Sequence, residues 1–210
     1  MTKGASLSMA DHLKSFTAVD VPLESVGTIL SDYLRRFGPV AVHPLTGIRE
    51  VLEFISPLKS FTTRFAAVGV ANWTYVITNM KGATGYVEGL AVCRKAGGRT
   101  IAVSLLPERR ELHIGEGGEN LRRIQSLLDF DRWYFAEHGT PLPFEEPSDH
   151  SRPRRERLSV QLLPRYFEAF VGQSVPDWSR FLSNPSIGLE RSISTLEVAV
   201  RSYEMSIDIP

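Results

Sequence analysis

Two histidines and three carboxylates in the middle of the chain are the residues that could support acid–base or metal chemistry. His113, Glu116, Asp129, Asp131 and His138 would come together if the segments between them form hairpins. Imidazole and carboxylate groups can hold a metal or transfer protons. However, the chain has no His-x-x-x-His or Glu-x-x-His spacing, and turns attract Asp and Glu for backbone reasons. The pattern therefore favours turn residues, with no catalytic residue, no metal site and no cofactor.

The glycine-containing loops and the single cysteine give no stronger sign of catalysis. The loops Gly82–Gly85 and Gly115–Gly118 lack the spacing of a P-loop or of a dinucleotide-binding turn. Glu116 and Glu119 would also repel a phosphate. Cys93 lies on the apolar face of a predicted helix, where a cysteine is usually a small buried side chain. No Gly-x-Ser-x-Gly motif occurs, so the sequence also lacks this sign of a serine hydrolase.

A cluster of arginines after residue 151 is the most distinctive charged feature of the chain. It follows Glu145, Glu146 and Asp149 directly, so its arginines could pair locally and fix a loop to the next helix. The same cluster could instead dock an acidic partner. Aromatic side chains on an exposed sheet face also suit protein contact. From these two features we predict six partner-binding residues: Arg152, Arg154, Arg155, Arg157, Tyr75 and Tyr134.

The composition of the 210-residue chain is that of an ordinary globular protein. Its 24 basic and 24 acidic residues cancel, whereas proteins that bind nucleic-acid backbones normally carry a basic excess. One cysteine allows no internal disulfide, and the longest apolar run, residues 65–71, is far too short to span a membrane. We therefore expect a cytoplasmic protein with no nucleic-acid or membrane partner. A net charge of zero favours self-association or a protein partner.

The segment from Phe65 to Leu106 organises the predicted fold. Phe65–Val70 and Trp73–Asn79 are apolar and β-branched runs with a two-residue link, which predicts an antiparallel hairpin. A loop, a helix and a third strand follow, at residues 80–85, 86–95 and 99–106. The loop lacks phosphate-binding spacing, so this unit is expected to form the core of a sheet and to carry no chemistry.

Periodicity on either side of this unit predicts further helices and strands. The helices are expected near residues 20–37, 46–55, 159–171 and 194–203. Strands are expected at residues 111–114, 121–128 and 132–136, and residues 176–188 are expected to be irregular. Residues 121–128 also fit a helix. We choose the strand because a glycine turn precedes this segment and a strong strand closely follows it.

Together these segments predict a single α+β domain over residues 1–210. Its core is a mixed, largely antiparallel sheet with N-terminal and C-terminal helices packed on it. We expect residues 1–10 to be disordered and residues 172–210 to form a helical extension packed on the core.

Several phrases of the sequence, in the same order, resemble uncharacterised bacterial proteins. They are Trp73–Asn79, Arg132–Phe135 leading to Pro143–Glu145, Arg154–Leu158 and Leu163–Tyr166. Some of the proteins they resemble look like immunity proteins of toxin systems. The resemblance spans residues 73–170 and includes no catalytic motif. It implies a small cytoplasmic α+β protein that works by binding, and it identifies neither a toxin nor a functional residue.

The leading interpretation is a non-enzymatic bacterial protein that binds another protein, such as an immunity-type inhibitor that binds a toxin. The first alternative is an enzyme or small-ligand-binding protein with a cleft near the loops after Asn79 and Leu128. The second alternative is a structural or oligomerisation module. Polar side chains that converge at those loops would favour the first alternative, and a solution mass would test the second.

Overall fold

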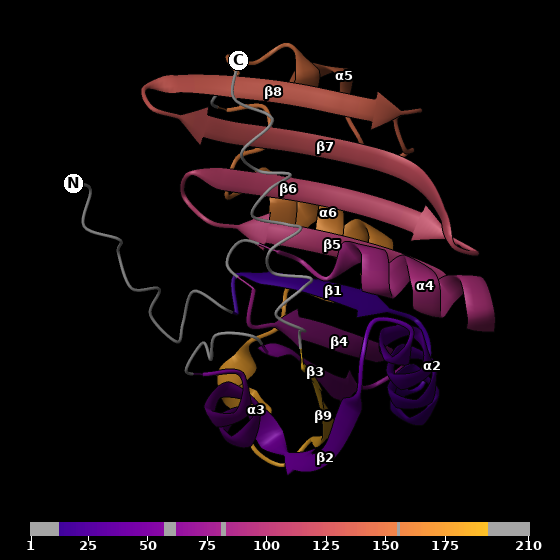
Figure 1. The fold of residues 1–210 in the computed structure, drawn as a ribbon. Helices are drawn as coiled ribbons and strands as arrows, with labels where there is room; N and C mark the ends of the chain where they lie inside the picture. Colours follow the sequence, from indigo (N-terminus) through magenta and orange to yellow (C-terminus); the bar gives the residue numbers. More distant parts are fainter. Residues whose placement is uncertain (1–12, 57–61, 81–82, 155, 193–210) are drawn as a thin grey trace.

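The computed structural model describes residues 13–56, 62–80, 83–154 and 156–192. These residues form one nine-stranded sheet with five helices (Figure 1). The strand order is β2-β9-β3-β4-β1-β5-β6-β7-β8, and each neighbouring pair is antiparallel. The α+β class and the largely antiparallel sheet are therefore confirmed, and the described strands include no parallel pair. No helix in these ranges is long and apolar enough to cross a membrane.

The bounds of the elements follow the hydrophobic periodicity closely. The strands are β1 (Ser15–Val19), β2 (Val40–Thr46), β3 (Thr62–Val70), β4 (Trp73–Thr78), β5 (Arg99–Leu105), β6 (Arg109–Glu116), β7 (Glu119–Asp129), β8 (Arg132–Gly139) and β9 (Pro185–Ser192). The helices are α2 (Leu23–Arg35), α3 (Gly47–Ile55), α4 (Tyr86–Ala96), α5 (Pro147–His150) and α6 (Leu162–Val171). The choice of a strand for residues 121–128 is confirmed by β7, and the predicted hairpin by β3 and β4.

The central hairpin is not next to the third strand of its unit, because β1 lies between them. Thr17 of β1 pairs with Val76 of β4 on one side and with Ala102 of β5 on the other. Every residue of β1 is buried. Its pairing with β4 and β5 makes it a central strand of the sheet.

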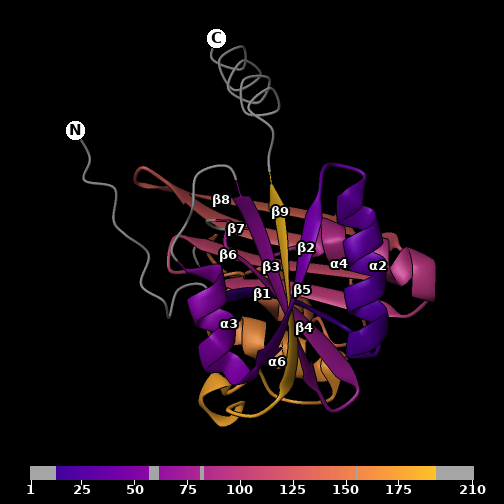
Figure 2. The same ribbon diagram turned by 60° about the horizontal axis from the view of Figure 1, so that its bottom comes forward.

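The helices cover the two faces of the sheet in pairs. α3 and α6 pack on one face, over a core that includes Phe16, Tyr75 and Ile101. α2 and α4 pack on the other face, over Val19 and Phe65. Figure 2 shows α2 and α3 on opposite sides of the strands that they cover. We refer to these surfaces as the α3–α6 face and the α2–α4 face.

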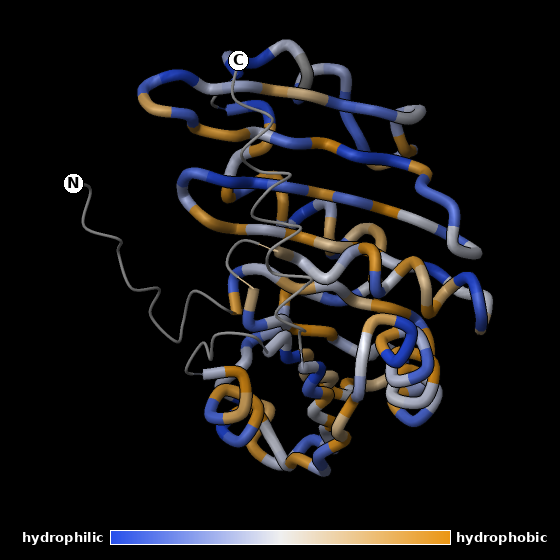
Figure 3. Tube along the Cα trace, in the orientation of Figure 1, coloured by the Kyte–Doolittle hydropathy of each residue, from blue (hydrophilic) through white to orange (hydrophobic). Residues whose placement is uncertain are grey.

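The α2–α4 face becomes polar towards the β8 edge. In Figure 1, α4 lies in front of β1 and β5, and β6 to β8 continue above it. Along β6, Leu112 and Ile114 point into the α3–α6 core, so Glu111 and His113 point to the α2–α4 face. Figure 3 shows long hydrophilic stretches in β6 to β8. This part of the sheet therefore presents polar side chains beyond the reach of α4.

The C-terminal part differs from the predicted helical extension. Residues 185–192 form β9, which lies between β2 and β3, although 176–188 were expected to be irregular. Ile187 and Leu189 alternate towards α2, and Gly188 between them lies on the opposite face, against Phe54. A Cβ at Gly188 would lie 2.9 Å from the Phe54 ring, so a larger residue there would require this ring to shift. The predicted helix at 194–203 and the predicted disorder at 1–10 lie outside the described residues.

Candidate functional site

A polar groove lies where β6 and β7 continue beyond α4. Its floor carries Arg109, Glu111 and His113 from β6, and Arg123 and Gln125 from β7. These side chains share one face because His113 pairs with Arg123, and Glu111 with Gln125, in the antiparallel register. The groove has a volume of about 490 Å³. That size suits a small molecule.

Glu111 is the buried charge of the polar groove. Its side chain is 3% exposed, and its Oε2 lies 3.1 Å from Arg109 Nε. Gln125 Nε2 donates a 2.5 Å hydrogen bond to Glu111 Oε1. A buried carboxylate needs such partners because water no longer solvates it. The charges of Arg109 and Glu111 therefore balance each other on the floor.

His113 lies beside this pair as an uncharged imidazole at neutral pH. Burial lowers its pKa to about 4, with smaller contributions in the same direction from Arg123 and Arg109, while Glu111 opposes them. The Tyr86 ring lies 4.7 Å from the imidazole. His113 Nε2 is buried and has no hydrogen-bond partner among the described residues. The imidazole therefore adds no charge to the floor.

The wall of the polar groove is formed by the loop before α4 and the first turn of that helix. Thr17 Oγ1 donates a 2.8 Å hydrogen bond to the carbonyl of Thr84, which ties the loop to β1. Gly89 allows α4 to lie close to the sheet, since a Cβ there would be 2.6 Å from Thr17 Cγ2. The Tyr86 hydroxyl donates to Asn120 Oδ1 at 2.9 Å. Burial raises the pKa of Tyr86, so this donor keeps its proton.

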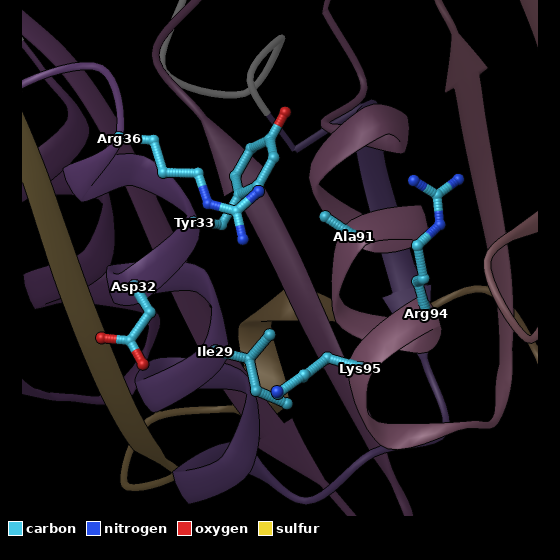
Figure 4. A pocket seen from close by; sticks show the side chains of 7 residues that line it. All are labelled: Ile29, Asp32, Tyr33, Arg36, Ala91, Arg94 and Lys95. Atoms are coloured by element: carbon cyan, nitrogen blue, oxygen red, sulfur yellow. The ribbon is translucent and has the colours of Figure 1, made fainter.

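A second hollow, the α2–α4 cleft, lies between the two helices of the same face (Figure 4). Its volume is about 310 Å³, and Ile29, Ala91 and Tyr33 are among its lining residues. In Figure 4, Arg36 extends over the Tyr33 ring towards α4, and Lys95 reaches towards Ile29 from α4. Both cations are exposed. This cleft therefore combines a partly apolar lining with a basic rim.

The candidate acid–base residues do not converge. His113 and His138 both pair with Arg123 from the strands on either side of β7. They therefore lie two strands apart, about 10 Å. Asp129 lies at the far end of β7, about 20 Å along the strand from Arg123. Across the described ranges, no group of three or more His, Cys, Asp or Glu side chains could hold a metal.

The arginine cluster lies on the α3–α6 side of the β7–β8 hairpin. Arg157 stacks on Phe135 at 5.0 Å and donates a 2.8 Å hydrogen bond to the carbonyl of Arg152. Arg152 Nη2 lies 3.4 Å from Asp149 Oδ1, as the local-pairing interpretation predicts. Arg154 is exposed. Arg155 lies outside the described residues.

Asp149 is fixed to α6 mainly by residues outside the cluster. Arg165 Nη2 lies 2.5 Å from Asp149 Oδ2, and the Tyr166 hydroxyl donates to the same oxygen at 2.8 Å. The hydrogen bond from Tyr166 and the nearby arginines lower the pKa of Asp149, although burial opposes them. Arg152 adds one further ion pair to Asp149, and the side chains of Arg152 and Arg154 remain exposed.

The two predicted tyrosines have different positions. Tyr75 is 1% exposed, so the expectation of an exposed ring is wrong for this residue. It lies on a central strand under α6, packs on Phe16 at 5.7 Å and accepts a hydrogen bond from Gln173 Nε2 at 2.8 Å. Tyr134 is 51% exposed and lies on the α2–α4 face opposite Leu127. Tyr134 alone can therefore contact a partner.

Cys93 and the loop Gly115–Gly118 have structural roles, as predicted. Cys93 is buried in the core under α2 and α4, and burial raises the pKa of its thiol to about 12. A reactive cysteine needs its thiolate form at physiological pH. Gly117 and Gly118 have positive φ angles and form the turn between β6 and β7.

The groove residues Arg109, Glu111, Arg123 and Gln125 are not among the residues predicted from the sequence. The signal was present as alternation, because Glu111 and His113 flank Leu112 and precede Ile114. Such alternation indicates only that one face of a strand is polar. The groove itself depends on where α4 and its preceding loop end, which the alternation does not indicate. One alternative from the sequence did predict that the loop after Asn79 lines a cleft.

Comparison with known proteins assigns this chain to no family. It has no significant match to a protein-family model, to a curated protein or to a solved structure. The resemblance to bacterial immunity proteins therefore depends on the sequence phrases alone.

Proposed function

We propose that this protein is non-enzymatic and binds another protein, which adds an extended segment to the sheet at β8. The contrast between the two edge strands carries this proposal. β2 contains Pro44, and a proline in an edge strand disfavours the addition of another strand. β8 contains neither proline nor lysine and is largely exposed. A partner strand can hydrogen-bond to such an edge.

Aromatic side chains beside this edge supply anchor points. Phe130, at the tip of the β7–β8 hairpin, is 97% exposed, and Tyr134 is 51% exposed. Large exposed aromatic residues are unfavourable in water and are typical of the residues that dominate binding energy at interfaces. A partner segment along β8 would cover both rings.

The arginine cluster would contact the same segment from the other face of β8. Arg152 and Arg154 are exposed there, and Arg157 is held against Phe135. Arg155 belongs to the same proposed surface by sequence. Positive charge on this side favours a partner segment that carries carboxylates. The proposed ligand is therefore an acidic, extended protein segment.

We further propose that the partner is a toxin and that the protein acts as an immunity-type inhibitor in the bacterial cytoplasm. The resemblance of Trp73–Asn79 and of the phrases around β8 to such proteins supports this assignment. The net charge of zero supports a protein partner over a nucleic acid.

Photo-cross-linking in the host cell tests the proposal at a defined position. A photoreactive phenylalanine analogue replaces Tyr134, and the same analogue at Leu182, which is 72% exposed, serves as the control. We expect one discrete partner to cross-link from position 134 and not from position 182. That partner, expressed alone, should inhibit growth, and co-expression of this protein should restore growth.

Purified components then give the decisive comparison. The double variant Phe130→Ser with Tyr134→Ser should weaken binding of the captured partner by about tenfold or more, because two aromatic anchors are lost. Leu182→Ser should bind like the wild type. Equal affinity of the double variant and the wild type would reject the β8 edge as the binding surface. Cross-linking from position 134 to a second copy of this chain alone would instead identify self-association.

A further inference from the structure

The polar groove contains one arginine that forms no ion pair with the described residues. Arg109 and Glu111 form an ion pair, and His113 is neutral. Glu88 on the groove wall is a second carboxylate of the lining, and burial raises its pKa. Arg123 is exposed and makes no hydrogen bond or ion pair with the residues that the structure describes. Arg123 thus leaves a full set of guanidinium donors directed at solvent or a ligand.

The groove also leaves hydrogen-bond donors unused beside Arg123. Asn120 uses Oδ1 to accept from Tyr86, which leaves its amide nitrogen as a donor. Gln125 uses its amide nitrogen to bind Glu111, which leaves its oxygen as an acceptor. Glu111 is already occupied by Gln125 and Arg109. A ligand that complements Arg123 and the Asn120 amide supplies acceptor oxygens and a negative charge.

We propose that the polar groove binds a small molecule through a compact oxyanion, a carboxylate or a phosphate group, with Arg123 as its charged partner. A planar guanidinium binds either group with two parallel hydrogen bonds. The volume of about 490 Å³ leaves room for a polar body beside the anion. This site is separate from the proposed partner surface at the β8 edge.

His113 lies next to the proposed anion position and can report on its occupancy. It pairs with Arg123 across β6 and β7, and Tyr86 lies over its ring. The charged groups that act on it are Glu111 and Arg109 on β6 and Arg123 on β7. An anion bound at Arg123 would offset the repulsion between this arginine and an imidazolium. The pKa of His113 should therefore rise when the groove is occupied.

Two other arginines provide matched controls. Arg132 is exposed on β8 and does not line the groove. Arg36 belongs to the α2–α4 cleft, which is also basic. Arg123→Gln, Arg132→Gln and Arg36→Gln each remove one exposed charge, so they separate a specific site from general attraction of anions.

The test uses the full-length protein with two probes, inorganic phosphate and malonate, at constant ionic strength. Calorimetry measures their affinity, and NMR follows the His113 imidazole, assigned with His113→Gln. We expect binding of at least one probe with an upward shift of the His113 pKa. Arg123→Gln should weaken that binding by about tenfold, the usual worth of a charged hydrogen bond. Arg132→Gln and Arg36→Gln should change it less than about twofold.

The outcomes distinguish the source of the anion and can reject the site. Phosphate binding alone identifies a phosphorylated ligand, and malonate binding alone identifies a carboxylate ligand. Loss of binding in Arg36→Gln with retention in Arg123→Gln would place the anion in the α2–α4 cleft and overturn the proposal. Equal losses in all three variants, or no binding and no His113 shift with either probe, would also overturn it. Arg123→Gln should still bind the β8 partner, so the two proposals fail independently.

Discussion

Arg122 and Glu145 form an ion pair that is closed off from solvent. Arg122 Nε lies 2.9 Å from Glu145 Oε1, and Arg122 Nη2 lies 2.7 Å from Glu145 Oε2. The two side chains are 1% and 0% exposed. Arg122 Nη1 also donates to the carbonyl of Gly139 at 2.9 Å. The pair thus ties the segment after β8 to β7 and fixes the end of the edge strand.

Removal of one partner of this pair should destabilise the protein more than removal of both. Glu145→Leu leaves the Arg122 charge buried with only the partly exposed Glu137, 2.7 Å from Arg122 Nη2, as its ion-pair partner. It should lower the free energy of unfolding by at most about 3–5 kcal/mol. The double variant Arg122→Met with Glu145→Leu leaves no buried charge and should be more stable than Glu145→Leu alone. Urea unfolding measures both values. If the double variant loses the sum of the two single losses, the pair is not coupled.

Gly139 should be irreplaceable at the end of β8, whereas Gly117 should tolerate alanine better. Both have positive φ angles. A Cβ at Gly139 would lie only 2.0 Å from the carbonyl oxygen of Leu121, but a Cβ at Gly117 would meet nothing within 4 Å. Gly117→Ala should therefore cost about 1–2 kcal/mol, the penalty for a left-handed residue. Gly139→Ala should cost clearly more in the same thermal unfolding assay, and equal costs would contradict this placement.

His113 should make stability depend on pH in the mildly acidic range. Its folded-state pKa of about 4 lies below its unfolded value of about 6.5, so the unfolded state binds the proton first. Stability should fall as the pH decreases from about 6.5 to about 4, by at most about 1.4 kcal/mol per pH unit from this residue. Above about pH 6.5 the contribution vanishes.

The variant His113→Gln isolates this effect. The free energy of unfolding of His113→Gln minus that of the wild type should increase steadily as the pH decreases through this range. His138→Gln changes an exposed histidine on β8 outside the groove and serves as the control substitution. A constant difference between His113→Gln and the wild type at all pH values would exclude a depressed pKa at this position.

Cys93 should be unreactive in the native protein. Its side chain is 0% exposed, and burial raises its pKa to about 12. A disulfide reagent at pH 8 should therefore modify no thiol until urea unfolds the chain, and then one thiol per molecule. Rapid modification of the native protein would show that the core under α4 opens readily.

Local sequence patterns were sufficient to predict most helices and strands, but not which strands lie side by side in the sheet. The hairpin of β3 and β4, the helices α2 and α4, and β7 follow from periodicity and turns. The position of β1 between β4 and β5 depends on pairing with distant residues, which periodicity does not encode. The same limit affects β9, because its pairing with β2 and β3 determines its place.

The positions of the candidate site residues likewise depend on contacts between distant segments as well as on local patterns. The exposure of Tyr134 follows from its place on an edge strand, and the burial of Tyr75 from its place on a central one. Alternation alone treats the two strands alike. The polar groove was harder to predict, because Glu111 and Arg123 look like ordinary solvent-facing residues until α4 and its preceding loop form a wall beside them.

The most direct test of strand addition at β8 is to measure amide hydrogen exchange of this protein, free and in complex with the partner identified by photo-cross-linking. Amides on the outer edge of β8, residues 132–139, should exchange rapidly in the free protein, because no described strand pairs with that side. The account predicts that they become strongly protected when the partner binds, while amides of β2 at the opposite edge stay unchanged. Protection of β2 or of α2 and α4, with β8 unaffected, would contradict it.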